Sequence, residues 1–179
     1  MNPIIPVVIG VGAIALFASK DAEASIDYSP SPSDPPIDYG KDMSGNIDAF
    51  LQVIKIGESN DNYRALLGGG NFTSFSDHPV YVDGFKGVGN SHAAGAYQFQ
   101  PGTWKEAQTS LGLPDFSPAS QDAAAIYLIR RRGAYDDIAM GRIDVAVGKL
   151  AGEWEMFKTS KWPVSTVITH FTEYGGNVA

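Results

Sequence analysis

The chain has 179 residues, a formal net charge of −7 and no cysteine. This length suits one compact domain with an additional segment, and the lack of thiols excludes disulfides and thiolate metal sites. Proteins that grip phosphate backbones usually carry a basic excess, so the acidic balance argues against nucleic-acid binding.

The N-terminal run, residues 3–18, contains no charged and no strongly polar side chain. The uncharged stretch is near the lower limit of a membrane span, which needs about 17–25 residues. Its prolines and glycines disfavour a soluble core helix but are tolerated in membranes. We predict a hydrophobic membrane anchor over residues 1–20. A cleaved signal peptide is the rival, because Ala22-Glu23-Ala24 resembles a cleavage site, although no basic residue precedes the apolar run.

Residues 21–45 are acidic and rich in proline and serine. Such a stretch cannot bury enough apolar area to fold, and we expect an extended, semi-rigid linker. The predicted layout is an anchor, a stalk and a globular head over residues 46–179. A head held beside a membrane suits a substrate that is itself a fixed layer near that membrane.

The head opens with an amphipathic pattern for which Asn46 is a plausible N-cap. Its apolar face consists of Ile47, Phe50, Leu51 and Ile54. One further turn along that face lies Glu58. Partial burial raises the pKa of a carboxyl group, which is the condition for a general acid near neutral pH. The same position also suits a glutamate that merely closes the edge of the core.

Residues 66–95 hold many glycines, and the short alternating pieces FTSFS and VYV predict small strands. Asp77 and His78 precede Pro79, and we interpret them as turn residues rather than metal ligands. No metal site and no cofactor are predicted.

Helical signals return after residue 100. Thr103 and Glu106 have the spacing of a capping box, and Gly112 is a natural C-cap. Ser117 with Pro118 starts a helix that should reach Gly133. Its basic end, Arg130–Arg132, complements the helix dipole. Further helices are expected over 135–140, 143–157 and 164–173. The fold class is therefore α+β, mostly helical with one small β element.

Four segments together resemble the family of bacteriophage lambda-type endolysins. They are GESN (57–60), FTSFSDHP (72–79), AAGAYQFQPGTW (93–104) and LGLPDFSPASQDAAA (111–125), and they occur in the family's order. The resemblance covers about residues 46–160. It implies a lysozyme-like fold and lytic transglycosylase activity on peptidoglycan.

The resemblance also assigns roles to residues. By position the family's catalytic glutamate falls on Glu58. The GAYQ block, with Gly95, Tyr97 and Gln98, is similar to the loop that borders the sugar-binding cleft. Trp104 and Asp77 are further candidates for substrate binding, although Trp104 also suits the core and Asp77 a structural role.

The implied reaction cleaves the β-1,4 bond between N-acetylmuramic acid and N-acetylglucosamine and forms 1,6-anhydro-muramoyl ends. One alternative is a lysozyme-type muramidase, in which Asp77 or Asp83 assists Glu58 and water attacks. Another is a non-catalytic peptidoglycan-binding protein anchored in a virion membrane. Expected partners are peptidoglycan glycan strands, the membrane through residues 3–18, and other phage lysis or virion membrane proteins. The catalytic domain would face peptidoglycan from the virion membrane or from the host inner membrane and periplasm, in genome entry or in host lysis.

Overall fold

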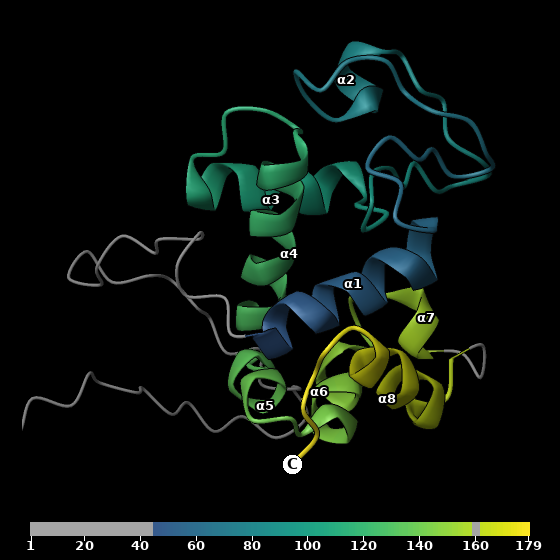
Figure 1. Cartoon of the computed structure of the whole chain (residues 1–179). Helices are drawn as coiled ribbons and strands as arrows, with labels where there is room; N and C mark the ends of the chain where they lie inside the picture. Colours follow the sequence, from purple (N-terminus) through teal and green to yellow (C-terminus); the bar gives the residue numbers. More distant parts are fainter. Residues whose placement is uncertain (1–44, 159–161) are drawn as a thin grey trace, which may run out of the picture.

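The computed structural model describes residues 45–158 and 162–179 (Figure 1). The predicted anchor and all but the last residue of the predicted linker lie outside the described residues. Within the described ranges, no helix combines the length and the apolar character needed to cross a membrane.

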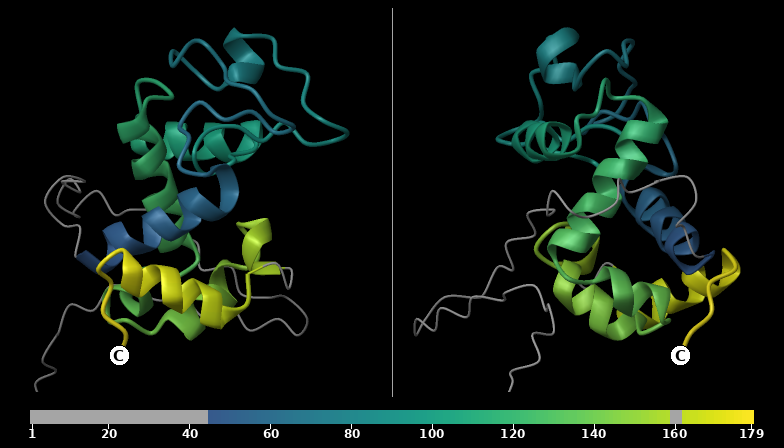
Figure 2. Two further views of the ribbon diagram at one scale, coloured as in Figure 1. Left: turned by 45° about the vertical axis from the view of Figure 1, so that its right-hand side comes forward. Right: turned by 90° about the vertical axis from the view of Figure 1, so that its left-hand side faces the viewer.

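The described residues fold mainly into helices. In chain order these are α1 (Gly45–Ser59), α2 (Pro79–Val82), α3 (Pro101–Leu111), α4 (Pro118–Arg131), α5 (Tyr135–Ala139), α6 (Ile143–Leu150), α7 (Glu155–Lys158) and α8 (Val164–Glu173). Helix α1 packs against α5 and α8, and α3 packs against α4. Figure 2 shows α4 running between the end of the molecule that holds α3 and the end that holds α5.

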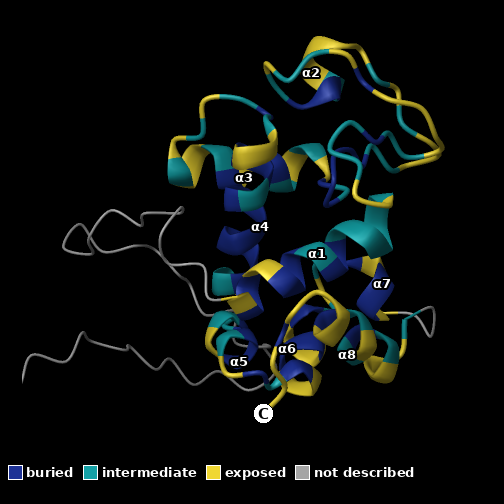
Figure 3. Cartoon of the chain, in the orientation of Figure 1, coloured by how far each residue is buried: buried dark blue, intermediate teal, exposed yellow. Residues whose placement is uncertain are grey.

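Figure 3 shows buried residues where these helices face one another. Aromatic side chains join the helices into one core. The Phe50 ring of α1 is 0% exposed, and its centroid lies 5.9 Å from that of Phe157 and 6.3 Å from that of Phe171. Trp104 is also 0% exposed, and its ring meets Phe116 edge-on at 4.6 Å. Each such burial stabilises the fold by about 1.5–3 kcal/mol.

The prediction that Asn46 is an N-cap is wrong. Helix α1 already includes Gly45, so Asn46 lies inside the helix. Its Nδ2 donates to the carbonyls of Ala139 at 3.0 Å and Asn177 at 3.1 Å, and its Oδ1 accepts from the Asn177 N–H at 2.8 Å. The side chain therefore ties the C-terminal segment to α1.

The capping box at Thr103 and Glu106 is also wrong. Helix α3 begins two residues earlier, at Pro101, where a proline at the first helical position has no N–H to satisfy. Glu106 instead forms an ion pair with Arg131 of α4. In a capping box the partner of Glu106 would lie in the first turn of the same helix, whereas its partner here lies in another helix.

The other helix ends follow the sequence more closely. Gly112 closes α3 in the left-handed conformation at φ 64°, and the Ser117 side chain caps α4 ahead of Pro118, as predicted. Helix α4 ends at Arg131 rather than reaching Gly133. The expected helix over 143–157 is two helices, α6 and α7, whereas α8 occupies 164–173 as predicted.

The predicted β element is not formed as strands. Val80–Val82, the piece VYV, belongs to helix α2, which starts at Pro79 and is capped by the His78 side chain. Across the described ranges, β pairing is limited to isolated bridges, Ala65 to Asn71, Leu66 to Ala94, Val88 to Ser91 and Ala94 to Phe99. His78, interpreted as a turn residue before Pro79, is the N-cap of α2, and the fold is mostly helical.

Candidate active site

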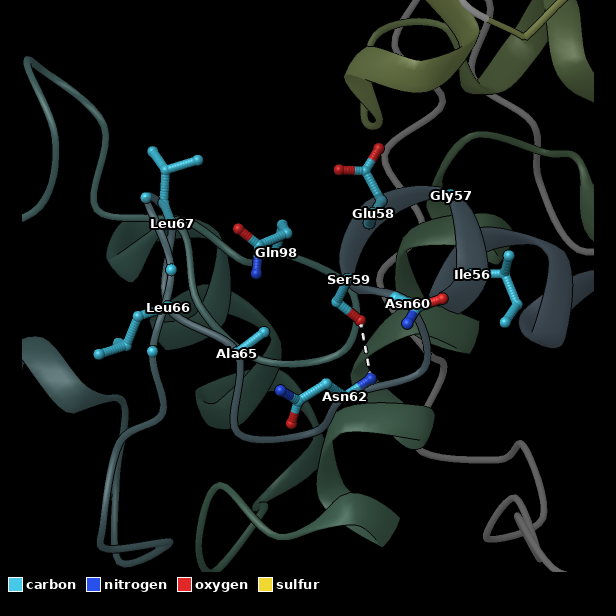
Figure 4. Close-up of a pocket in the computed structure, with 13 residues that line it drawn as sticks. Ile56, Gly57, Glu58, Ser59, Asn60, Asn62, Ala65, Leu66, Leu67 and Gln98 are labelled. Atoms are coloured by element: carbon cyan, nitrogen blue, oxygen red, sulfur yellow. Dashed lines mark hydrogen bonds between the residues drawn. The ribbon is translucent and has the colours of Figure 1, made fainter.

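A cleft of about 460 Å³ lies at the C-terminal end of α1 (Figure 4). Its walls are the last turn of α1 with Asn60, the glycine-rich loop 65–70, and the side chains of Asn62 and Gln98. Two of the predicted site residues, Glu58 and Gln98, line it together although 40 positions separate them in the sequence.

Helical periodicity explains the position of Glu58. Ile54, one turn earlier, is 0% exposed, whereas Glu58 is partly exposed where the buried face of α1 reaches the cleft. The backbone N–H of Met156 donates to Glu58 Oε1 at 3.3 Å. Among the described residues that line the cleft, Glu58 is the one carboxylate. The carboxylate can therefore act on a ligand in the cleft while it is held from behind.

Ser59 joins the two sides of the cleft. Its hydroxyl lies 2.9 Å from the carbonyl oxygen of Ala96 and accepts from the N–H of Asn62 at 3.1 Å (Figure 4). The GESN segment and the GAYQ segment are thus connected directly behind the cleft.

Gln121 of α4 makes a second connection, which the sequence analysis did not find. The side chain is 0% exposed. Its Oε1 accepts from the Ala96 N–H at 2.8 Å, and its Nε2 donates to the carbonyls of Tyr63 at 3.1 Å and Phe116 at 2.8 Å. An amide in an otherwise alanine-rich helical stretch, SQDAAA, is the signal that was available. One side chain therefore fixes three loops.

The backbone is strained at this cleft. Within the described ranges, the non-glycine residues with positive φ are Asn60 at 56°, Asp61 at 61° and Gln98 at 49°, and two of them line the cleft. Each such conformation costs about 1–3 kcal/mol and is typical of functional sites. Gly95 has φ 80°, and a Cβ there would lie 2.4 Å from Gln121 Oε1. Gly95 therefore serves the loop geometry.

Two predicted sugar contacts lie in the core instead. Tyr97 is 1% and Trp104 0% exposed, so neither ring has a free face, and their prediction as direct saccharide contacts is wrong for this structure. The Tyr97 hydroxyl donates to Asp122 Oδ1 at 2.6 Å. Burial, reinforced by the Asp122 carboxylate, raises the pKa of Tyr97 well above its usual value. Both residues support the cleft from behind.

The two candidate second carboxylates are engaged elsewhere. Asp77 Oδ1 accepts from Trp104 Nε1 and from the His78 N–H, both at 2.8 Å. Asp83 Oδ2 accepts from the Thr73 N–H at 2.7 Å, and this hydrogen bond lowers the pKa of Asp83. Neither residue lines the cleft. In the described part of the chain, no three His, Asp or Glu side chains converge as a metal site.

This helical fold, with a cleft at the end of its first helix, is that of a lysozyme-like protein. The solved lysozyme of bacteriophage lambda is similar with a TM-score of 0.68 and 31% sequence identity, over 76% of this chain and 98% of the lambda chain. The same values hold for the lambda lysozyme solved in complex with a chitohexasaccharide.

The sequence comparisons agree with the structural one. The sequence model of the Endolysin family matches residues 48–178. The endolysin of Escherichia phage lambda is 33% identical over 144 residues, 73% of this chain and 91% of the relative. The endolysin of Escherichia phage P2 is 39% identical over 127 residues, 61% of this chain and 77% of the relative. The chain belongs to the Endolysin family. The family match leaves residues 1–47 outside and lends no support to a membrane segment there.

Proposed function

We propose that this protein is a peptidoglycan lytic transglycosylase in which Glu58 serves as both acid and base. The observation that carries the proposal is the position of Glu58 as the one carboxylate among the described residues lining the cleft. Glycoside hydrolases generally use two carboxylates on either side of the scissile bond. An intramolecular transfer needs one group that gives and then takes a proton. Membership in the Endolysin family supports peptidoglycan as the substrate.

The reaction consumes no water. Glu58 donates its proton to the glycosidic oxygen as the bond from that oxygen to C1 of N-acetylmuramic acid breaks. The 6-hydroxyl of the same sugar then attacks C1 and gives its proton to the Glu58 carboxylate. The products are a 1,6-anhydro end and a free 4-hydroxyl, and Glu58 is again protonated. Because the nucleophile belongs to the substrate, its effective concentration is very high.

Some of the remaining site residues contact the glycan, and the others support the walls of the cleft. Gln98 faces the cleft, and we assign it a hydrogen bond to the glycan. Loop 68–70 is all glycine, which allows a sugar to approach the backbone closely. Gly95, Tyr97, Trp104 and Asp77 hold these parts in place from behind. The oligosaccharide bound to lambda lysozyme supports a cleft that accepts several sugar units.

Substitution of the acid tests the proposal. Glu58→Gln keeps the shape of the side chain but has no proton to give, and activity on purified peptidoglycan should fall by about 10²–10⁴-fold. Glu155→Gln is the matched control, because this exposed carboxylate adjoins Met156 and forms an ion pair with Lys158 at 3.4 Å. Wall clearing by Glu58→Gln at the wild-type rate would show that Glu58 is not the acid.

Product analysis tests the reaction type. Mass spectrometry of digested peptidoglycan should show 1,6-anhydro ends and no ¹⁸O when the digest is run in H₂¹⁸O. Reducing ends that carry ¹⁸O would instead identify a muramidase, and Asp77→Asn and Asp83→Asn would then locate its second carboxylate.

Residues 1–20 retain the sequence-based prediction of a membrane anchor. An anchored enzyme should stay with membranes during alkaline extraction, whereas a cleaved signal would leave a mature chain that starts near Ser25. Immunodetection in purified phage particles separates a role in entry from a role in lysis.

A further inference from the structure

Gly57 occupies an unusual position, inside helix α1 and directly before the proposed acid. Glycine destabilises a helix relative to alanine, so its presence there needs a reason. A Cβ at this position would lie 2.5 Å from Met156 Cε and 2.6 Å from Met156 Sδ. Both distances are far below van der Waals contact. The Met156 thioether therefore fills the space that a side chain at position 57 would need.

Met156 touches the acid as well as the glycine. It is 2% exposed and belongs to α7, which lies beside the C-terminal end of α1 (Figure 1). Its side chain lies on Gly57, and its backbone N–H donates to Glu58 Oε1 at 3.3 Å. The next residue, Phe157, stacks on Phe50 of α1. Residues of α7 thus contact α1 both at Phe50 and at the turn that carries Glu58.

We propose that Gly57 and Met156 are positioning residues for Glu58. The bare backbone at position 57 lets α7 approach α1 closely enough for the Met156 N–H to orient the carboxylate in the cleft. This inference rests on the proposed function, in which Glu58 transfers the proton. Met156 lies outside the cleft lining, whereas Gly57 belongs to the turn of α1 that forms its wall.

A methyl group at position 57 should disturb this contact. Only the flexible end of Met156 meets the new Cβ, but the residue is 2% exposed, so its end has to turn within the packed core. We expect α7 to shift with the displaced thioether, which lengthens the hydrogen bond from the Met156 N–H to Glu58. Displacement of a catalytic group by about 1 Å can cost about 10²-fold in rate.

The test enlarges the residue at position 57, shortens the residue at position 156, and measures the activity of each variant on soluble glycan strands. Gly57→Ala should lower kcat by about 10- to 100-fold and leave KM within about twofold. Met156→Ala removes the Sδ and Cε atoms that the new methyl group meets. The double variant should therefore recover kcat to within about threefold of Met156→Ala alone.

The matched control is Gly148→Ala in α6. That glycine is also helical, but a Cβ there has nothing within 4 Å. The control should keep wild-type kcat and raise stability by the ordinary helix preference of alanine. A loss of kcat that occurs in both variants would come from alanine in a helix in general. Only the additional loss in Gly57→Ala is assigned to position 57.

A pH profile distinguishes positioning from packing. The limb where activity falls as pH rises should move to higher pH in Gly57→Ala, because the ionised carboxylate loses an N–H donor. A purely structural contact would leave that limb in place. Melting temperatures of all variants confirm that the folded protein is compared.

Three results would overturn the inference. These are wild-type kcat in Gly57→Ala, an unmoved pH limb, or a loss of tenfold or more when Gly57→Ala is added to Met156→Ala. The last comparison stands even where Gly57→Ala alone does not fold. Glu58→Gln in the same assay distinguishes a failure of the proposed function from a failure of the positioning role. An active Glu58→Gln contradicts the proposed function, whereas an inactive one beside a fully active Gly57→Ala contradicts only the positioning.

Discussion

The helices α1 and α4–α8 and the segment 60–100 obtain their order in different ways. The helices bury apolar residues on shared faces, and their aromatic rings stack across helix boundaries. The segment 60–100 contains one short helix. Its Tyr97 and Phe99 rings join the core, but hydrogen bonds between its backbone and the side chains of Ser59 and Gln121 hold the loops at the cleft. Stability should therefore depend mainly on the helices, whereas the shape of the cleft should depend on the segment.

The largest effect on stability is expected in the helical region. Phe171 of α8 is 0% exposed and meets Phe50 at 6.3 Å. Phe171→Ala leaves a cavity and should lower the free energy of unfolding by about 3–5 kcal/mol in urea titrations. Activity of the protein that remains folded should be near the wild-type level. Val145→Ala, at a side chain 42% exposed on α6, is the control and should change stability by less than about 0.5 kcal/mol.

The same contrast explains what could be predicted from the sequence. Helix α8, the C-cap at Gly112 and the N-cap at Ser117 depend on local patterns, and all were predicted correctly. The apolar face of α1 also indicated where Glu58 would lie. The ordered motifs identified the family, because each is specific in itself and their order adds to it.

Long-range partners could not be predicted in this way. Asn46 and Glu106 have the residue types and spacing of helix caps, but their side chains bind Asn177 and Arg131, far along the chain. The piece VYV is too short for its alternation to separate a strand from a helical turn, and the His78 cap with Pro79 decided for the helix. Tyr97 is buried where its hydroxyl binds Asp122 of α4 and its carbonyl accepts from Trp154 Nε1, and no local pattern contains these partners.

An intermediate effect is expected from His78, which belongs to the segment 60–100. Its ring is 0% exposed, and burial lowers the pKa of His78 below the usual value of 6.5. The Val80 N–H donates to Nδ1, so Nε2 carries the proton and donates to the Phe99 carbonyl at 2.9 Å. The folded state thus keeps the ring neutral while the unfolded state gains a proton below pH 6.5.

Stability should therefore fall as pH drops through 6.5 toward the lower folded-state pKa of His78, by up to about 1.4 kcal/mol per pH unit from this residue. Melting curves between pH 8 and 5 measure the loss, with His92→Gln and His170→Gln as controls that should retain it. Nitrogen chemical shifts that report a protonated Nδ1 in folded protein at pH 6 would contradict the assignment.

The smallest effect on stability is expected at Gln98, where the effect on activity should be large. Glycine adopts φ 49° without strain, and this gain offsets the lost hydrogen bond from Gln98 Nε2 to the Gly95 carbonyl. Gln98→Gly should therefore change the free energy of unfolding by less than about 1 kcal/mol. Its kcat/KM on glycan strands should fall by about tenfold, because the glycan loses a hydrogen-bonding partner. Gln98→Asn keeps an amide and tolerates the left-handed conformation, so it should retain more activity than the glycine variant. Full activity in Gln98→Gly would remove Gln98 from the sugar contacts. A stability loss above about 2 kcal/mol would instead show that this segment supports the fold as strongly as the helices do.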